Sequence, residues 1–442
     1  MTRSHYLSVC KASTSETIRK KQTTCSRVYL TAFAALTFSL LAGQSAYAGS
    51  TPNFPVPKDF FGMHLITKEN WPTVPIGALG AGTLVRWIYI ERSKGVYDWS
   101  LLDAWVMTAQ QHGVSFHYTN DGVPAWAVAD RSTCAPSSID SVLDCNAPPM
   151  NIQDWDDFVT ALVTRYKGKI TYYELWNEPD NQYWLAGAKS HTKPGAMKTS
   201  DMVMLTKHAH DIIRRIDPNA KIISPSFHGS GEWFMDQYYA AGGVTDVDIV
   251  SIHGYPESGK ITPEGSISNH VNRLLPIISK YGLQNKPLWD TEIAWSDQSN
   301  NAITDPDEQS AFVARSLLLH WSRGLTRIYW YAWDHGANIG TLWDPKNGAH
   351  KAANAYNQVQ MWMIGATMSA PCAVGIDQTT WSCGLTRPGY KAIVVWNTRG
   401  DTFYTPPSEF KQYRILDGGA ALPVTRAIKI GEKPLIVETS NP

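Results

Sequence analysis

The sequence predicts an α/β fold, a (β/α)₈ TIM barrel followed by a small C-terminal β-sandwich. Eight short β-branched or aromatic runs alternate with helix-like segments through the middle of the chain, which is typical of a parallel sheet covered by helices. Together these segments span roughly 310 residues, which fits a barrel of about 250 residues plus insertions. After about residue 366 the pattern changes to short strands separated by turns, which indicates a separate β domain.

The eight predicted barrel strands are mostly apolar and are bounded by turn residues, as strands buried on both faces should be. They are Phe60–Ile66, Thr83–Tyr89, Val114–Tyr118, Ile170–Trp176, Lys221–Ser224, Asp248–His253, Pro287–Ile293 and Thr326–Trp330. A doubly wound sheet is the alternative fold, but no glycine-rich phosphate loop follows the first strand.

Apolar stripes with capping and stop residues predict the intervening helices. Asp98 or Ser100 can cap a helix that ends at Gly113. Pro306 stands at the start of another, which Gly324 closes. The helices therefore fall between the predicted strands, as a barrel requires.

The predicted domains are a leader over residues 1–48, the catalytic barrel over 49–365 and the β-sandwich over 366–442. The segment near 50–58 is expected to join the sandwich, with Asn53–Pro57 or a neighbour supplying its first strand. The other sandwich strands are predicted at Trp381–Thr386, Tyr390–Asn397, Gln412–Leu416 and Leu435–Glu438.

The N-terminus has the pattern of a secretory signal peptide. A basic stretch over Arg19–Arg27 precedes the apolar run Val28–Ala42, and Ala46-Tyr47-Ala48 fits a cleavage site. The run is short for a membrane span, although an uncleaved anchor is the alternative. No later segment is apolar enough to span a membrane, so the mature protein is expected to be secreted or periplasmic.

Cysteine usage agrees with export, because four cysteines remain after the leader: Cys134, Cys145, Cys372 and Cys383. An even number in an exported chain suggests disulfides. Of the three possible pairings, Cys134–Cys145 and Cys372–Cys383 close short loops and are the expected ones. A zinc site is the competing interpretation, but the chain has no Cys-x-x-Cys spacing.

Composition excludes several classes of partner. Removing residues 1–48 leaves 33 basic and 38 acidic residues, a net charge near −5, which argues against nucleic acid or an anionic membrane surface. The 18 Trp and 20 Tyr residues can fill a large core or stack on flat apolar faces such as those of sugar rings.

Two glutamates fall at strand ends, where barrel enzymes carry their active sites. The fourth predicted strand leads to Glu178 and the seventh to Glu292, 114 residues later, which is three strand–helix units. Strands four and seven approach opposite sides of one barrel mouth. Two facing carboxylates suit glycosidic cleavage, in which one acid donates a proton and the other is ionised. Glu174 and Asp290 share their strand parity, but one pleat deeper they are expected to be buried structural acids.

The motifs Trp176-Asn177-Glu178-Pro179 and Trp289-Asp290-Thr291-Glu292 resemble clan A of the glycoside hydrolases, and within it family 39. Phe61-Gly62-Met63-His64, the run from Arg92 to Trp99 and the run from Tyr329 to Asp334 strengthen the resemblance, which covers about residues 59–440. It implies a retaining mechanism through a covalent glycosyl-enzyme, with carboxylates roughly 5 Å apart and no metal or organic cofactor.

The resemblance also implies roles for individual residues. Glu178 is the expected acid/base and Glu292 the nucleophile; Asn177 would bind the sugar 2-hydroxyl, Arg86 would orient the nucleophile, and Tyr255 of His253-x-Tyr255 would steady it. Trp330 or Trp333 would lie under the sugar. Further sugar contacts are expected at His64, His117, Asn120, Trp126, Trp184 and Trp343.

The function predicted from these residues is retaining hydrolysis of O-glycosidic bonds, with a polysaccharide or oligosaccharide as substrate. The compact mature chain and the many candidate cleft tryptophans favour endo action on a bacterial exopolysaccharide. An exo-acting β-xylosidase-like enzyme is the alternative within the family. From other classes, a catalytically inactive carbohydrate-binding barrel and a transglycosylase are the competing hypotheses.

Overall fold

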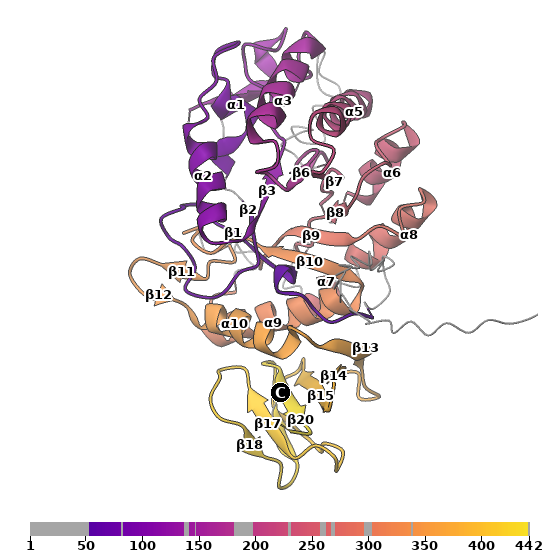
Figure 1. Ribbon diagram of the computed structural model, residues 1–442. Coiled ribbons are helices and arrows are strands. Elements are labelled where there is room, and N and C mark those ends of the chain that lie inside the picture. The colour runs from indigo at the N-terminus through magenta and orange to yellow at the C-terminus, as the bar shows by residue number, and fades with distance from the viewer. Residues whose placement is uncertain are drawn as a thin grey trace, which may run out of the picture. The chain divides into compact units, whose positions relative to one another are not determined.

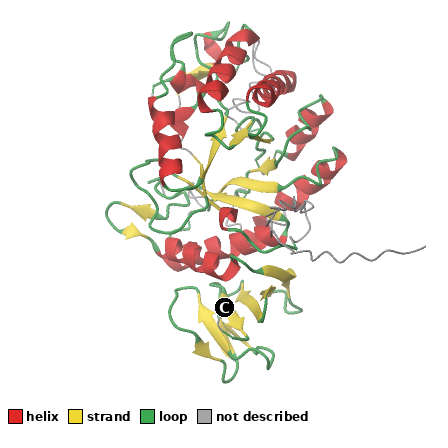
Figure 2. Ribbon diagram, viewed as in Figure 1, coloured by secondary structure: helices red, strands yellow, loops and turns green. Residues whose placement is uncertain are grey.

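The computed structural model describes residues 53–440 except 81–82, 137–140, 146, 181–197, 229–230, 257–261, 267–269, 296–302 and 337–338. The predicted leader, residues 1–48, lies outside this range. The described chain forms a (β/α)₈ barrel and, toward the C-terminus, an antiparallel sheet (Figures 1 and 2).

The barrel is a ring of eight parallel strands in the order β7-β6-β3-β2-β1-β10-β9-β8. Bridges from Ile223 to Ile249 and from Phe227 to Ile252 join β7 to β8 and close the ring. The strands are β1 Phe61–His64, β2 Ala78–Gly80, β3 Ser115–Thr119, β6 Tyr172–Glu174, β7 Lys221–Ile223, β8 Val250–Ile252, β9 Leu288–Ile293 and β10 Leu325–Trp330.

Helices surround the ring (Figure 2). Because neighbouring strands are parallel, the chain must cross back to the starting edge of the sheet after each strand, and the helices make these connections. They are α1 Trp87–Ile90, α2 Ser100–Gln111, α3 Ile152–Tyr166, α5 Thr199–Ile216, α6 Glu232–Ala240, α7 Pro263–Ser266, α8 Asn272–Lys280, α9 Pro306–Ser322 and α10 Lys351–Met363, with 3₁₀ helices η1 Lys58–Phe60, η2 Thr83–Val85 and η3 Arg131–Thr133. Pro306 begins α9 and Gly324 follows it with a φ of 89°, both as predicted.

One predicted strand is wrong. Thr83–Tyr89 is not the second strand; it folds into η2 and most of α1, and the strand is β2. Four apolar side chains of that segment, Val85, Trp87, Ile88 and Tyr89, are buried, while Leu84 is exposed. Their apolar character therefore reflects burial and not sheet pairing. In β2, a Cβ at Gly80 would overlap the ring of His64, which explains why this strand carries so little β propensity.

The antiparallel sheet has the order β13-β14-β15-β20-β17-β18, and a separate pair, β16-β19, lies over part of it. The bounds are β13 Thr367–Val374, β14 Thr380–Arg387, β15 Tyr390–Asn397, β16 Thr402–Tyr404, β17 Gln412–Ile415, β18 Leu422–Pro423, β19 Ile428–Ile430 and β20 Leu435–Glu438. Alternating residues of β15 serve two cores. Val395 packs with Ile428 and Ile430 inside the sandwich, whereas Val394 belongs to the main core.

The prediction that Asn53–Pro57 supplies the first sandwich strand is wrong, because β13 fills that place. Val56 makes one bridge to Ile364, and its N–H donates to the carbonyl of Ala366 at 2.9 Å. The segment therefore runs beside the turn that connects α10 to β13.

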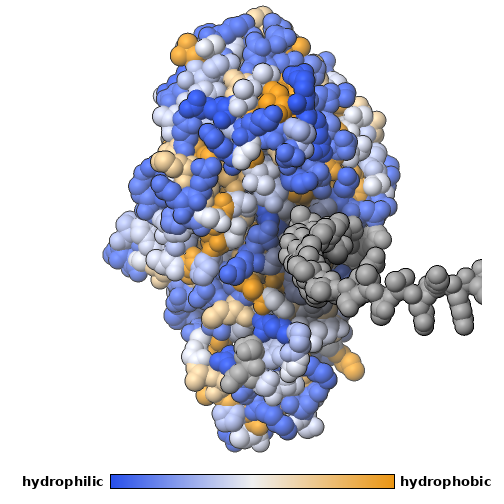
Figure 3. Space-filling model, in the orientation of Figure 1, coloured by the Kyte–Doolittle hydropathy of each residue, from blue (hydrophilic) through white to orange (hydrophobic). Residues whose placement is uncertain are grey.

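Small two-stranded hairpins decorate the barrel, β4 Cys134–Pro136 with β5 Leu143–Cys145 and β11 Trp343–Asp344 with β12 Gly348–Ala349. No helix among the described residues is long and apolar enough to cross a membrane. Figure 3 shows that the visible face is largely hydrophilic, with apolar residues in small patches, as expected when the large apolar side chains form the core.

Candidate active site

Glu178 lies in the turn that follows β6. Its backbone has a φ of 38°, in the left-handed region that non-glycine residues seldom adopt. The N–H of Glu178 donates to Oγ of Ser226 at 3.3 Å, and the residue is only 7% exposed. The turn directs this carboxylate into the barrel mouth at the cost of local backbone strain.

Glu292 lies near the end of β9, where the pairing with β10 shifts register between Asp290 and Ile293. The phenol of Tyr255 donates to its Oε1 at 2.6 Å, and its side chain is 19% exposed. Its backbone N–H donates to Oδ1 of Asp290 at 3.3 Å. The second carboxylate is therefore held by a rigid strand and a neighbouring tyrosine.

His253 lies between the two glutamates. Its Nδ1 is 2.7 Å from Oε1 of Glu178 and 3.9 Å from Oε2 of Glu292. One ligand atom from each of the three residues lies within 4.8 Å of the others. Retaining glycosidases hold their carboxyl groups about 5–5.5 Å apart and inverting ones about 6.5–9.5 Å apart, so the separation fits the retaining class.

The charges of the three groups are coupled. Burial alone would lower the pKa of His253, but the carboxylates of Glu292 and Glu178 outweigh it and raise that pKa to about 10. Burial raises the pKa of Glu292 to about 7, with His253 opposing the shift and Glu178 adding to it. At neutral pH the imidazole is a cation between two carboxyl groups.

The same spacing would suit a metal ion, since two carboxylates and an imidazole are common ligands. Here, however, Nδ1 of His253 is the hydrogen-bonding partner of Glu178, and a protonated imidazole has no lone pair to offer a metal. The residues therefore fit proton chemistry better than metal binding.

Glu174, four residues before Glu178, is buried and accepts several hydrogen bonds. Its two oxygens accept hydrogen bonds from the hydroxyls of Ser251 at 2.6 Å, Thr291 at 2.8 Å and Thr119 at 2.9 Å. His117 approaches the same carboxylate at 3.4 Å. One carboxylate thus ties together β3, β6, β8 and β9, the strands that lead to the site.

Asp290 supports the opposite side. Its Oδ1 accepts from the N–H of Gly254 at 3.0 Å as well as from that of Glu292, and His320 lies 3.1 Å from its Oδ2. A Cβ at position 254 would overlap this carboxylate, so glycine is required between His253 and Tyr255. Both deeper acids are buried and structural in placement, as the strand parity predicted.

Comparisons with known proteins bear on this geometry. Residues 96–360 match the family model described as glycosyl hydrolase catalytic core, a stretch that includes both glutamates. The chain belongs to this family. No curated protein sequence matches.

Solved structures show the same fold as this glycoside hydrolase. A family 39 glycoside hydrolase from Bacteroides cellulosilyticus WH2 superposes with a TM-score of 0.65 at 17% identity, over 86% of this chain and 81% of that one. A monomeric β-xylosidase from Caulobacter crescentus CB15 gives a TM-score of 0.60 at 14% identity, over 89% and 97%. A family 30 endoxylanase from Clostridium papyrosolvens C71 gives 0.55 at 14%, over 89% and 98%.

Three predicted sugar contacts of the glycoside hydrolase lie beside the glutamates. His64 is 7% exposed and its Nε2 is 2.8 Å from the carbonyl of Thr291; burial lowers its pKa to about 4, so it is neutral. Asn120 is buried, and its carbonyl accepts the N–H of Asn177 at 3.2 Å. Oδ1 of Asn120 has no hydrogen-bond partner among the described residues, while Asn177 is half-buried next to Glu178.

Arg86 does not have the predicted placement. It precedes α1 and does not end a strand, and its Nε is 3.1 Å from Oδ2 of Asp121. Asp144 adds a second negative charge near the guanidinium. The phenol of Tyr255 contacts Glu292, and an orienting role for Arg86 stays a prediction.

The two platform tryptophans are also not where a sugar could reach them. Trp330 and Trp333 are both 0% exposed, and Nε1 of Trp330 donates to the carbonyl of Gly340 at 2.7 Å. Trp126 and Trp343 are half-buried, and Nε1 of Trp126 donates to the carbonyl of Glu91 at 2.7 Å. The remaining candidate, Trp184, lies outside the described residues.

Sequence reasoning missed two residues at the site. Tyr331 is half-buried, its ring lies 5.4 Å from that of His64, and it interacts electrostatically with Tyr255; its place directly after β10 was the available signal. Asp180, two residues after Glu178, accepts the N–H of His228 at 3.0 Å. Burial and the nearby Glu178 carboxylate raise the pKa of Asp180 to about 7.

Both predicted disulfides are present, Cys134–Cys145 and Cys372–Cys383. The first joins β4 to β5 and carries Asp144, whose Oδ1 accepts the N–H of Val123 at 3.2 Å. The hairpin therefore packs on the loop after β3, beside Arg86.

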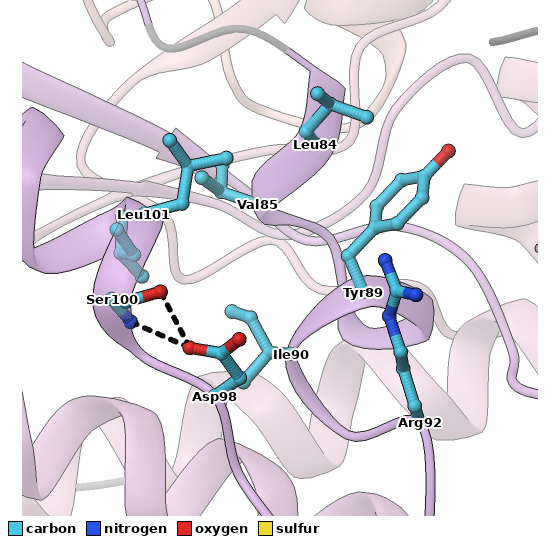
Figure 4. Close-up of a pocket in the computed structure, with 9 residues that line it drawn as sticks. Leu84, Val85, Tyr89, Ile90, Arg92, Asp98, Ser100 and Leu101 are labelled. Carbon is cyan, nitrogen blue, oxygen red and sulfur yellow. Dashed lines mark hydrogen bonds between the residues drawn. The ribbon is translucent and has the colours of Figure 1, made fainter. Parts of the chain in front are cut away.

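A separate cavity of about 150 Å³ lies between η2, α1 and the start of α2. Figure 4 shows its lining, including Leu84, Tyr89 and Arg92, with the Oδ1 atom of Asp98 accepting from both N–H and Oγ of Ser100. Neither glutamate lines it, so it is not the catalytic centre.

Proposed function

We propose that this glycoside hydrolase cleaves O-glycosidic bonds with retention of configuration, with Glu292 as nucleophile and Glu178 as acid/base. The observation that carries the proposal is the approach of the two carboxylates within 4.8 Å. That separation leaves room for a sugar carbon but not for a water on the opposite face, which an inverting mechanism needs.

In the first step, Oε2 or Oε1 of ionised Glu292 forms a bond to the anomeric carbon while the glycosidic C–O bond breaks. The leaving oxygen takes a proton from Glu178. Nδ1 of His253 lies 2.7 Å from Oε1 of Glu178, so the His253–Glu178 pair shares a proton at neutral pH. Glu178 passes this proton to the leaving oxygen.

In the second step, Glu178 removes a proton from water, the water oxygen bonds to the anomeric carbon, and Glu292 leaves as a carboxylate. Two displacements restore the original configuration. Tyr255 assists both because its hydrogen bond stabilises the Glu292 anion. The neutral side chains of Asn177 and Asn120 are the proposed partners of the sugar hydroxyls.

We propose a bacterial exopolysaccharide as the substrate and endo cleavage as the mode of action. The supports are the family 39 resemblance, the export features of the sequence, and the two disulfides, which are compatible with an extracellular or periplasmic location. A conserved exported protein from Bacteroides fragilis has the same fold, with a TM-score of 0.58.

An exo-acting β-xylosidase is the second candidate, because two of the similar folds are β-xylosidases from Caulobacter crescentus. Purified protein incubated with a panel of polysaccharides separates the two. Endo cleavage lowers the viscosity of the solution early, while few reducing ends appear; exo cleavage releases monosaccharide with little loss of viscosity. Products longer than the substrate would identify a transglycosylase.

Retention is tested by NMR of the anomeric proton during the first minutes of hydrolysis. The first product should carry the configuration of the substrate. An inverted first product would refute the two-step mechanism. If wild type releases no sugar from any substrate and Glu178→Gln binds oligosaccharide as tightly as wild type, the protein is a binding barrel.

A further inference from the structure

The tryptophans of the described chain are buried or half-buried, with one exception. Trp233, near the start of α6, is 43% exposed. Single exposed apolar side chains are common on protein surfaces, so the exposure of Trp233 is informative through the groove that surrounds it. Its neighbour Phe234 is buried and packs edge-to-face against it, with ring centroids 5.5 Å apart, which restricts the orientation of the indole.

Trp233 lies in a shallow groove between α6 and α8, two helices that lie side by side on the barrel flank (Figure 1). The groove has a volume of about 350 Å³, within the range of small-molecule sites. Its floor is apolar and its edges are charged. The lining residues are Glu232, Trp233, Asp236, Pro276, Ile277 and Lys280.

The charges at the edges balance one another. Arg273 lies 3.4 Å from Glu232, and Lys280 lies 2.5 Å from Asp236. The hydroxyl of Tyr281 also donates to Asp236 at 2.9 Å. A flat apolar floor with fixed polar groups at its sides complements a sugar ring, which has apolar C–H faces and hydroxyls around its edge. Because the edge charges are paired, a neutral sugar fits better than a charged one.

The groove begins next to the proposed catalytic mouth. Helix α6 follows β7, so its first residues lie on the face where the barrel strands end. Gly231 precedes α6 and packs so closely on Asp180 that a Cβ there would overlap the carboxylate. Asp180 is two residues from Glu178, so the start of α6 packs against the turn that carries Glu178.

We propose that the groove around Trp233 is a second, non-catalytic binding site for a neutral polysaccharide, with the indole stacked on a sugar ring. The inference rests on the proposed function, because the bound chain would be the polymer that Glu178 and Glu292 cut. Two contacts on one rigid body raise the effective concentration of the polymer at the mouth. A substrate too short to bridge them gains nothing from the groove.

The first test is Trp233→Ala, compared on two substrates. The ratio of kcat/KM on a soluble polysaccharide to kcat/KM on a 4-nitrophenyl glycoside should fall about 5- to 10-fold, as loss of one stacking contact implies. Phe403→Ala is the matched control, because Phe403 is a 74% exposed aromatic on β16 of the other domain. The control should keep the wild-type ratio. An unchanged ratio in Trp233→Ala would overturn the proposal.

The second test measures binding without turnover. Glu178→Gln and the double variant Glu178→Gln/Trp233→Ala are run in native gels containing soluble xylan, xyloglucan or a neutral bacterial exopolysaccharide. The single variant should be retarded by at least one polymer, and the double variant less. Equal retardation of the single and double variants, or no retardation of either in any gel, would contradict polysaccharide binding in the groove. If the wild type hydrolyses nothing but retardation depends on Trp233, the proposed function fails and the binding site stands.

Discussion

The two glutamates of the site have the same side chain but opposite backbone settings. Glu178 sits in a turn with a left-handed φ of 38°, is 7% exposed and contacts His253. Glu292 sits near the end of β9, at a register shift, and Tyr255 donates to it. In the proposed mechanism the two identical groups have different tasks. The turn would bring one group and its proton toward the leaving oxygen, and the strand would hold the other for attack.

The support under each glutamate repeats this division. Glu174 collects hydroxyl donors from three other strands, whereas Asp290 accepts two backbone N–H groups of its own neighbourhood. Substituting each glutamate and its supporting residues in turn tests whether the two sides of the site have different tasks.

The largest effect is expected from Glu292→Ala. Loss of the nucleophile should lower kcat/KM by about 10⁴-fold or more, because no covalent intermediate can form. Sodium azide should restore part of the activity and give a glycosyl azide of inverted configuration, observed by NMR. A glycosyl azide of retained configuration would mean that the two roles are exchanged.

Glu178→Ala should have an effect that depends on the leaving group. With a sugar as leaving group the rate should fall about 10²- to 10⁴-fold, the range of general acid catalysis. With a 2,4-dinitrophenyl glycoside the first step should stay close to wild type, because that leaving group needs no proton. Equal losses on the two substrates, measured by pre-steady-state release of dinitrophenol, would contradict the assignment.

The pH profile separates the two environments next. Glu292 acts as an anion, so kcat/KM should fall as pH drops through its pKa of about 7. In Tyr255→Phe the anion loses a hydrogen bond, its pKa rises, and the midpoint should move up by about one pH unit. Tyr413→Phe, on β17 of the sandwich, is the control. If the midpoint does not move in Tyr255→Phe, the hydrogen bond from Tyr255 does not stabilise the Glu292 anion.

A smaller effect is expected from Glu174→Gln, since Glu174 touches no substrate atom. Loss of its charge should lower the pKa of His253, to which this carboxylate contributes, and move the basic limb of the pH profile downward. We expect kcat to fall about 5-fold with KM unchanged, and unfolding to become easier by about 2 kcal/mol. A stability loss without any change in the profile would reduce Glu174 to a purely structural residue.

Much of this site was predictable because strand ends of a barrel meet at one mouth. The motifs around Glu178 and Glu292, and the His253-x-Tyr255 spacing, placed four residues together that are separated by up to 114 positions. Tyr255 and Glu292 belong to neighbouring strands, β8 and β9, whereas His253 and Glu178 meet across β7, which lies between β8 and β6. The local disulfides were predictable for a similar reason, since each closes a hairpin or an adjacent strand pair.

The predictions that the structure contradicts failed for physical reasons that a local sequence pattern does not show. The strand Ala78–Gly80 ends in a glycine of low β propensity because a Cβ there would overlap the ring of His64, while the more β-like segment 83–89 folds into η2 and α1. Trp330 or Trp333 was expected under the sugar from the family resemblance, yet both are 0% exposed and belong to the main core. Tyr331, with the opposite parity to Trp330, reaches the site instead. Arg86 found its partner on a loop, Asp121, which sequence spacing does not indicate.

The place of the proposed nucleophile, Glu292, on β9 has a use beyond explaining hydrolysis. A serine at position 292 would remove the attacking oxygen while the strand keeps its backbone, leaving Glu178 able to deprotonate an acceptor sugar. Offered a glycosyl fluoride of inverted configuration, such a chain would join sugars and could not cut what it had made. A barrel proposed to cut glycosidic bonds would then serve as a catalyst for making them.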